Sequence, residues 1–313
     1  MISSFLRLVR WRNLLFIAIT QWLFYFFVVR SLQFDPYPIR PSVHGLFYLL
    51  MLASLLIAAG GYIINDYFDL QIDTLNKPQK VVVDRQVKRR WVIVWHFIFS
   101  GAGIVLSLYI SYRTGYLIIG IVNIVCVLLL WFYSTHFKRQ LLIGNLVISA
   151  LTAWVIIVLY FFAGAGLLNY NGWHEGNYNY DMRKLYQLTV IYAGFAFIIS
   201  LVREVVKDLE DMYGDERYHC KTMPIVWGVP VAKMFAAVWL LVCVAALLIM
   251  QFYMWQSGWW EEALYSTALV IIPLIYVMKL LYFSKTSVDF HKLSGWLKLI
   301  MLAGILSMLF FLK

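Results

Sequence analysis

The chain has 313 residues, of which 63% are hydrophobic and 13% charged, and its formal net charge is +10. A soluble domain of this length carries roughly 25% charged residues. The composition therefore excludes an ordinary water-soluble fold and predicts a protein embedded in a membrane. The positive charge then indicates membrane orientation and attraction to lipid headgroups, and it is not the footprint of a nucleic-acid-binding protein.

Apolar stretches long enough to cross a bilayer recur along the whole chain. A spanning helix needs about 20 mainly apolar residues. The nine predicted spans are 13–29, 46–64, 91–112, 116–133, 141–163, 188–202, 231–253, 263–283 and 296–312. The sixth is short, and we expect its helix to continue beyond the apolar stretch. No Pro- or Ser-rich linker interrupts the pattern, so the sequence predicts an all-α polytopic membrane protein with one domain over residues 1–313.

The distribution of Lys and Arg predicts the orientation of the spans. Twenty of the 26 basic residues fall on the side of the N-terminus and the even-numbered loops, and six fall on the other side. Loops rich in Lys and Arg stay in the cytoplasm. The N-terminus is therefore expected in the cytoplasm and the C-terminus on the opposite side of the membrane.

Two aspartate trios repeat with the same spacing. Residues 65–73 read NDYFDLQID and residues 207–215 read KDLEDMYGD, so that aspartates recur with a constant offset of 142 positions. The trios are Asp66, Asp69 and Asp73, and Asp208, Asp211 and Asp215. In an α-helix such positions fall within about 60° of one another, so each trio would present three carboxylates on one side. Gly214 favours a helix end just before Asp215, which would take the last carboxylate off this side.

Carboxylates at a membrane need a partner. Each costs about 2.5–3.5 kcal/mol at the bilayer centre, and two facing clusters would repel one another. Mg²⁺ prefers oxygen ligands and commonly bridges carboxylates to substrate phosphates. The three cysteines and six histidines show no paired spacing that would indicate zinc. The two trios therefore predict a site for a magnesium-bound diphosphate.

Basic side chains flank both trios. Lys and Arg neutralise phosphoryl oxygens directly. The candidates are Lys77, Lys80 and Arg85 near the first trio and Arg203, Lys207 and Lys221 near the second. The same residues also serve as topology determinants, and both interpretations stay open. Glu204 and Glu210 are each expected to pair with a nearby Lys or Arg, so neither is assigned as a base for the acceptor.

These motifs resemble those of a known family. The stretch NDYFDLQIDTLNKP (65–78) resembles the N-D-x-x-D-x-x-x-D motif of the UbiA superfamily of intramembrane prenyltransferases. REVVKDLEDMYGDERYHCKTMPIVWG (203–228) resembles its second aspartate motif, and YSTHFKRQLLIGN (133–145) is similar to its Tyr-Ser…Lys-Arg…Gly-Asn segment. The resemblance extends from about Arg10 to Gly228.

The resemblance implies an enzyme that transfers a prenyl group from an isoprenyl diphosphate to a lipophilic acceptor. The helices would surround a central lipid-accessible cavity in a bacterial or archaeal cytoplasmic membrane, with the active site facing the cytoplasm. Mg²⁺ held by the six aspartates would stabilise the leaving diphosphate as the C–O bond ionises. No nucleic acid or protein partner is implied.

The resemblance also implies roles for three further residues. Asn65 would assist metal or phosphate binding, and Lys138 would bind substrate. Tyr133 would face the developing carbocation, because aromatic faces attract positive charge. For Tyr133 a structural role, and for Lys138 a role in topology, stay open as alternatives.

The second motif looks most like that of members that alkylate the glycerol hydroxyl of a geranylgeranylglyceryl phosphate-type ether-lipid precursor. One loop departs from the family pattern, which has R-P-[IL]-x-S-G where this chain reads KVVVDR (80–85). The departure keeps a positive charge at Lys80 and adds Arg85. Two alternatives stay open: prenylation of an aromatic acceptor in quinone biosynthesis, and a cation or solute transporter. Transporter sites usually lie near the membrane midplane, which disfavours the transporter.

Overall fold

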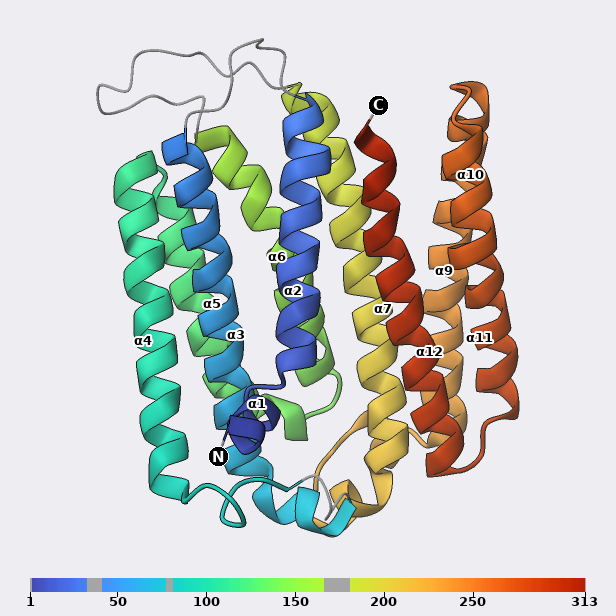
Figure 1. Cartoon of the computed structure of the whole chain (residues 1–313). Helices are drawn as coiled ribbons and strands as arrows, with labels where there is room; N and C mark the ends of the chain where they lie inside the picture. The colour runs from blue at the N-terminus through green and yellow to red at the C-terminus, as the bar shows by residue number, and fades with distance from the viewer. Residues whose placement is uncertain (1, 33–40, 77–80, 166–180, 313) are drawn as a thin grey trace. The chain divides into compact units, whose positions relative to one another are not determined.

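A computed structural model describes residues 2–32, 41–76, 81–165 and 181–312 (Figure 1). Within these ranges the regular elements are helices, without strands, and one isolated β-bridge joins Val83 to Val87. The α-helices are α1 (Ile2–Leu8), α2 (Trp11–Leu23), α3 (Pro41–Asn76), α4 (Arg89–Thr114), α5 (Leu117–Thr135), α6 (Ile143–Ala165), α7 (Met182–Arg217), α8 (Met223–Val226), α9 (Val229–Gln256), α10 (Trp260–Ser266), α11 (Ile272–Phe283) and α12 (Ser287–Leu306).

Nine helical stretches in the described residues are long and apolar enough to cross a membrane. They are Trp11–Leu32, His44–Asn76, Arg89–Thr114, Leu117–Thr135, Ile143–Gly164, Met182–Arg217, Val229–Gln256, Trp260–Phe283 and Ser287–Phe311. Each corresponds to one span predicted from the sequence. The prediction of an all-α protein with nine spans is confirmed, and so is the continuation of the sixth helix beyond its apolar stretch.

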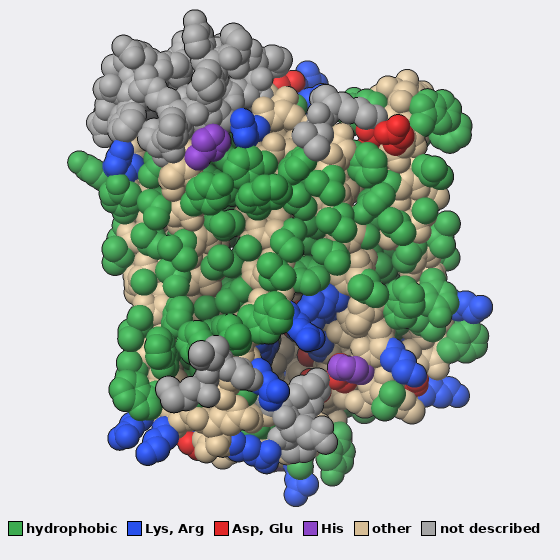
Figure 2. Space-filling model, in the orientation of Figure 1, with side chains coloured by type: hydrophobic (Ala, Val, Ile, Leu, Met, Phe, Trp, Pro, Cys, Tyr) green, Lys and Arg blue, Asp and Glu red, His purple; other side chains and the backbone are tan. Residues whose placement is uncertain are grey.

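The helices expose large apolar side chains where a soluble protein would bury them. Ile249, Phe252 and Leu264 are 75%, 68% and 72% exposed. Figure 2 shows one face, on which hydrophobic side chains cover the middle of the helices and charged side chains lie mainly toward their ends. A soluble monomer rarely exposes so large an apolar surface. These side chains are placed to contact lipid.

The chain forms two compact units. The first comprises Met1–Phe137 and Trp154–Val190, and the second comprises Lys138–Ala153 and Ile191–Lys313. The division falls inside α6 and α7, so each of these helices contributes residues to both units. The prediction of a single domain with a central cavity stays a prediction.

In the first unit, α3 packs closely against α4 and α5. Gly103 of α4 faces Ala53 and Ile57 of α3, and a Cβ atom at position 103 would lie 2.7 Å from Ile57 Cγ1. His96 Nδ1 donates a hydrogen bond of 2.9 Å to the carbonyl oxygen of Gly60. Small residues allow such close approach between membrane helices. This packing fixes α3, which carries the first aspartate trio.

In the second unit, one face of α7 is apolar and packs into the core. Ile199, Val202 and Val206 are buried there together with Leu240 of α9 and Leu293 of α12. Their spacing of three and four residues keeps them on one side of the helix. By the same spacing, the opposite side of α7 carries Glu204, Lys207, Asp208 and Asp211. The core therefore fixes the helix rotation that directs the motif.

Helices α3 and α7 match one another in length and in the position of their trios. Each has 36 residues, which gives a length of about 54 Å against an apolar core of about 30 Å. The trios lie in the C-terminal part of each helix, beyond the apolar stretch. α7 continues through Asp215 to Arg217, so the helix end expected at Gly214 was wrong. A glycine inside a helix costs only about 1 kcal/mol, which the backbone hydrogen bonds of α7 offset.

Candidate metal and diphosphate site

The first motif lies on one side of the C-terminal part of α3. Asn65 Nδ2 donates a hydrogen bond of 2.7 Å to Asp69 Oδ2, one helical turn further on. The side-chain oxygen of Asn65 is buried and has no hydrogen-bond partner among the described residues. A buried carbonyl oxygen beside carboxylates is a ligand of the kind that Mg²⁺ prefers. This orphaned oxygen therefore fits the predicted metal.

Arg10, between α1 and α2, reaches the same motif. Its guanidinium donates a hydrogen bond of 2.6 Å to Asp66 Oδ1 and lies 5.2 Å from the ring centre of Tyr62. The Asp66 carboxylate raises the pKa of Arg10 above its ordinary value, so the pair stays charged. Arg10 has a φ of 51°, in the left-handed region that non-glycine residues rarely adopt. The ion pair and the contact with Tyr62 offset this strain.

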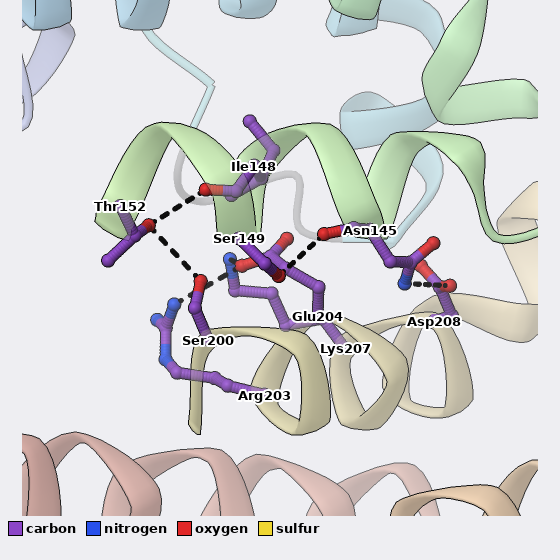
Figure 3. A network of polar contacts seen from close by, with 9 residues as sticks. All are labelled: Asn145, Ile148, Ser149, Thr152, Ser200, Arg203, Glu204, Lys207 and Asp208. Atoms are coloured by element: carbon purple, nitrogen blue, oxygen red, sulfur yellow. Dashed lines mark hydrogen bonds and ion pairs between the residues drawn. The ribbon is translucent and has the colours of Figure 1, made fainter. Parts of the chain in front are cut away.

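The second motif is connected to α6. Asn145, in the first turn of α6, donates a hydrogen bond of 2.8 Å from Nδ2 to Asp208 Oδ2 (Figure 3). Ser149 Oγ donates to the backbone oxygen of Asn145, and Thr152 Oγ1 lies 3.2 Å from Ser200 Oγ. The Asn145–Asp208 and Thr152–Ser200 contacts join α6 to α7, and the Asn145 amide orients the Asp208 carboxylate.

Three charged side chains of α7 come within the five residues before Asp208 in the sequence. Lys207 Nζ lies 2.6 Å from Glu204 Oε1, and Arg203 lies 3.4 Å from the same oxygen (Figure 3). The expectation that Glu204 pairs with a nearby Lys or Arg is confirmed. Glu210 pairs with His291 of α12, at 2.9 Å. The sequence did not predict this contact, because it comes from a helix distant in sequence.

The other predicted residues lie in several places. The backbone N–H of Lys221 donates to the carbonyl oxygen of Arg139 at 2.8 Å, so the loop after the second motif lies beside the turn that contains Lys138. Tyr133 is half-buried in α5, and Arg85 is exposed. Lys77 and Lys80 lie outside the described residues.

The predicted metal ligands are not gathered in one place within the part of the chain that the structure describes. No group of three His, Cys, Asp or Glu side chains there could hold a metal ion by itself. Each trio extends along a helix, with its members one turn apart. The convergence of the two trios on shared metal ions therefore stays a prediction.

Comparison with known proteins identifies the family. Residues 13–302 match the model of the UbiA prenyltransferase family. The chain belongs to this family. It is an integral membrane prenyltransferase, and the resemblance of its motifs is confirmed.

This prenyltransferase is similar over most of its length to named relatives and to solved structures of UbiA homologues. A digeranylgeranylglyceryl phosphate synthase of Methanoregula boonei is 32% identical over 72% of this chain and 71% of its own length. A protein of the same name from Methanosphaera stadtmanae is 28% identical over 84% and 88%. The structure of a UbiA homologue from Aeropyrum pernix has a TM-score of 0.61 at 16% identity, and each chain is covered to 98%. One from Archaeoglobus fulgidus, bound to DMAPP and Mg²⁺, has a TM-score of 0.56 at 14% identity, covering 97% of this chain and 99% of the other.

Three residues of this UbiA-family site had no role assigned from the sequence. Asn145 is the last residue of the segment that resembled the family, and Glu204 follows the first residue of the second motif. The sequence therefore contained a signal for each: Asn145 lies in the segment that resembles the family, and Glu204 lies in the second motif at helical spacing from Lys207 and Asp208. Arg10 precedes the stretch that matches the family model and is 56 residues from Asp66, so only the folded structure connects the two.

Proposed function

We propose that this prenyltransferase moves an isoprenyl group from a prenyl diphosphate to the glycerol hydroxyl of a geranylgeranylglyceryl phosphate-type acceptor. The observation that carries the proposal is the similarity to relatives named digeranylgeranylglyceryl phosphate synthase, at 32% and 28% identity. The second motif, with its K-D-L-E-D-M-Y-G-D sequence, supports the same acceptor. The product would be an ether lipid with two prenyl chains.

The six aspartates of the two trios would hold Mg²⁺, together with the Asn65 side-chain oxygen. Bound Mg²⁺ would neutralise negative charge on the diphosphate leaving group. The all-oxygen donor set supports this metal, and so does the Mg²⁺ bound to the Archaeoglobus fulgidus homologue. Asn145 would orient Asp208, and Tyr133 would present its ring to positive charge on the prenyl group.

Basic residues would bind the phosphoryl groups of the substrates. Candidates are Lys77, Lys80, Arg85, Lys138, Arg203, Lys207 and Lys221. Both trios follow even-numbered spans, and twenty of 26 basic residues belong to the same side by chain order. By the positive-inside rule, this side, the N-terminus and the proposed site would lie in the cytoplasm.

The test is an assay of the purified full-length protein in lipid nanodiscs. Labelled geranylgeranyl diphosphate is offered with geranylgeranylglyceryl phosphate, and separately with phenolic acids, with and without Mg²⁺. We expect a doubly prenylated glyceryl phosphate and release of diphosphate only when Mg²⁺ is present. The Asp208→Ala variant, which lacks a proposed metal ligand, serves as the inactive control.

Two results would overturn the proposal. A product formed only with a phenolic acid would move the enzyme to aromatic acceptors, as in quinone biosynthesis. Cation flux in liposomes with no prenyl transfer to any acceptor would favour a transporter.

A further inference from the structure

The repeat between α3 and α7 breaks at the charged residues that precede the second trio. With the offset of 142 positions, Arg203, Glu204 and Lys207 correspond to Gly61, Tyr62 and Asn65. The aspartates are repeated, but this charged group is not. The two helices therefore share the proposed metal ligands, whereas only α7 carries two cations within the five residues before its trio.

Arg203 has donors that the described residues do not use. A guanidinium has five N–H donors, and the contact found for Arg203 is the long one of 3.4 Å to Glu204. Its Nε atom is buried and has no hydrogen-bond partner in the part of the chain that the structure describes. The side chain is 22% exposed, so a ligand can reach it. A planar, permanently charged group with an orphaned Nε and a partly exposed side chain suits an oxyanion with several acceptor oxygens.

Glu204 gives this pair of cations a fixed arrangement. Both Arg203 and Lys207 approach the same carboxylate oxygen, at 3.4 and 2.6 Å. These three side chains carry two positive charges and one negative charge. Asp208, the next residue after Lys207, attracts Lys207 electrostatically and accepts a hydrogen bond from the amide of Asn145. Arg203, whose contact with Glu204 is the longer one, is therefore the cation of this group that is arranged for an additional anion.

The place of Arg203 separates it from the proposed metal ligands. It precedes Asp208 by five residues, which is about 7.5 Å along the helix axis, and it lies directly after the apolar stretch of α7. A phosphate bound there would lie close to the membrane-embedded part of a lipid. A diphosphate held through Mg²⁺ at Asp208 would lie further from the apolar stretch.

We propose that Arg203 and Lys207, held in position by Glu204, bind the phosphate monoester of the lipid acceptor directly and without metal. This rests on the proposed function, which requires an acceptor that carries a phosphate. A phosphate monoester has a charge of about −1.5 to −2 at pH 7 and three acceptor oxygens. It matches the fork of Arg203 and the ammonium group of Lys207.

The experiment compares acceptors with and without the phosphate. For the wild type and for Arg203→Gln and Arg203→Lys, kcat/KM is measured with geranylgeranylglyceryl phosphate and with geranylgeranylglycerol, and KM is measured for the prenyl diphosphate. We expect Arg203→Gln to reduce the preference for the phosphorylated acceptor by about tenfold or more, as for the loss of a charged hydrogen bond. Arg203→Lys keeps the positive charge but loses the planar, forked guanidinium, so its preference for the phosphorylated acceptor should lie between those of the wild type and Arg203→Gln. The KM for the diphosphate should stay unchanged. Arg217→Gln, an equal loss of charge at an exposed position on α7, is the matched control.

A measurement on the wild type covers the case in which the variants do not fold. Arginines are modified with phenylglyoxal and the adducts are mapped by mass spectrometry. The phosphorylated acceptor, but not the prenyl diphosphate with Mg²⁺, should protect Arg203. The inference is wrong if the diphosphate protects Arg203, or if Arg203→Gln raises the KM for the diphosphate while the acceptor preference persists. If the wild type uses no phosphorylated glycerol acceptor at all, the proposed function itself fails.

Discussion

At the scale of single residues, the hydrogen bond between Asn145 and Asp208 determines how one carboxylate of the second motif is presented. The bond occupies Oδ2 of Asp208, and Asn145 is 8% exposed. Groups that hydrogen-bond to a metal ligand orient it, and their loss typically weakens metal binding 10–100-fold. If Asp208 is a metal ligand as proposed, the amide of Asn145 orients that ligand, although it need not contact the metal.

We expect Asn145→Ala to raise the Mg²⁺ concentration needed for half-maximal activity about tenfold. The reason is that Asp208 loses the donor that fixes its rotamer. A similar loss of metal affinity should appear when Mn²⁺ binding is titrated without substrate and followed by electron paramagnetic resonance. Ser149→Ala is the control, because Ser149 donates only to the backbone oxygen of Asn145. Unchanged Mn²⁺ affinity in Asn145→Ala would contradict the role.

At the scale of elements, the contact between α3 and α4 depends on a glycine. A Cβ atom at Gly103 would lie 2.7 Å from Ile57 Cγ1 and 3.3 Å from the backbone oxygen of Ala53. Backbone cannot move aside as a flexible side chain does. At Gly101, two residues earlier on the same helix, a Cβ atom would meet nothing within 4 Å. The two positions form a matched pair.

We expect Gly103→Ala to lower the stability by about 1–3 kcal/mol, the usual effect of overpacking. Gly101→Ala should leave the Tm unchanged or slightly raised, because alanine favours a helix over glycine. Thermal unfolding of both variants in the same detergent measures the difference. Equal Tm values would show that α3 and α4 do not pack as closely as the structure has them.

Helices could be predicted from the sequence where a local property, such as apolar length or helical spacing, determines them. The nine spans follow from apolar length alone, and the two trios follow from helical spacing. Gly214 shows the opposite case: its low helix propensity favoured an end, but α7 continues to Arg217. The cost of one glycine is about 1 kcal/mol, less than the backbone hydrogen bonds of the remaining turn contribute. Propensity therefore misjudged the last turn of the helix.

The sequence predicted which aspartates are candidate metal ligands, but not all of the side chains that contact the acidic residues of the two motifs. The aspartates were visible as a repeat, and the pairing of Glu204 with basic neighbours follows from spacings of one and three residues. Arg10 and His291 reach their carboxylate partners over 56 and 81 residues. No local pattern encodes such contacts, because they depend on how helices pack.

At the scale of the whole molecule, the orientation in the membrane is the property that decides which compartment supplies the substrates. The positive-inside rule predicts that the loop between α9 and α10 faces outward and that the loop between α11 and α12 faces the cytoplasm. Each loop offers an exposed polar residue for labelling, Ser257 in the first and Lys285 in the second. The three native cysteines are buried, so the wild type supplies a low background for thiol labelling.

We expect Ser257→Cys to react with a membrane-impermeant maleimide in intact cells, and Lys285→Cys to react only after the membrane is opened. The physical reason is the asymmetry of twenty against six basic residues, since translocating Lys and Arg across the membrane is unfavourable during insertion. Retained activity of both variants shows that each is correctly inserted. The reverse labelling pattern would place the N-terminus and both aspartate motifs outside, where a prenyl diphosphate made in the cytoplasm could not reach them.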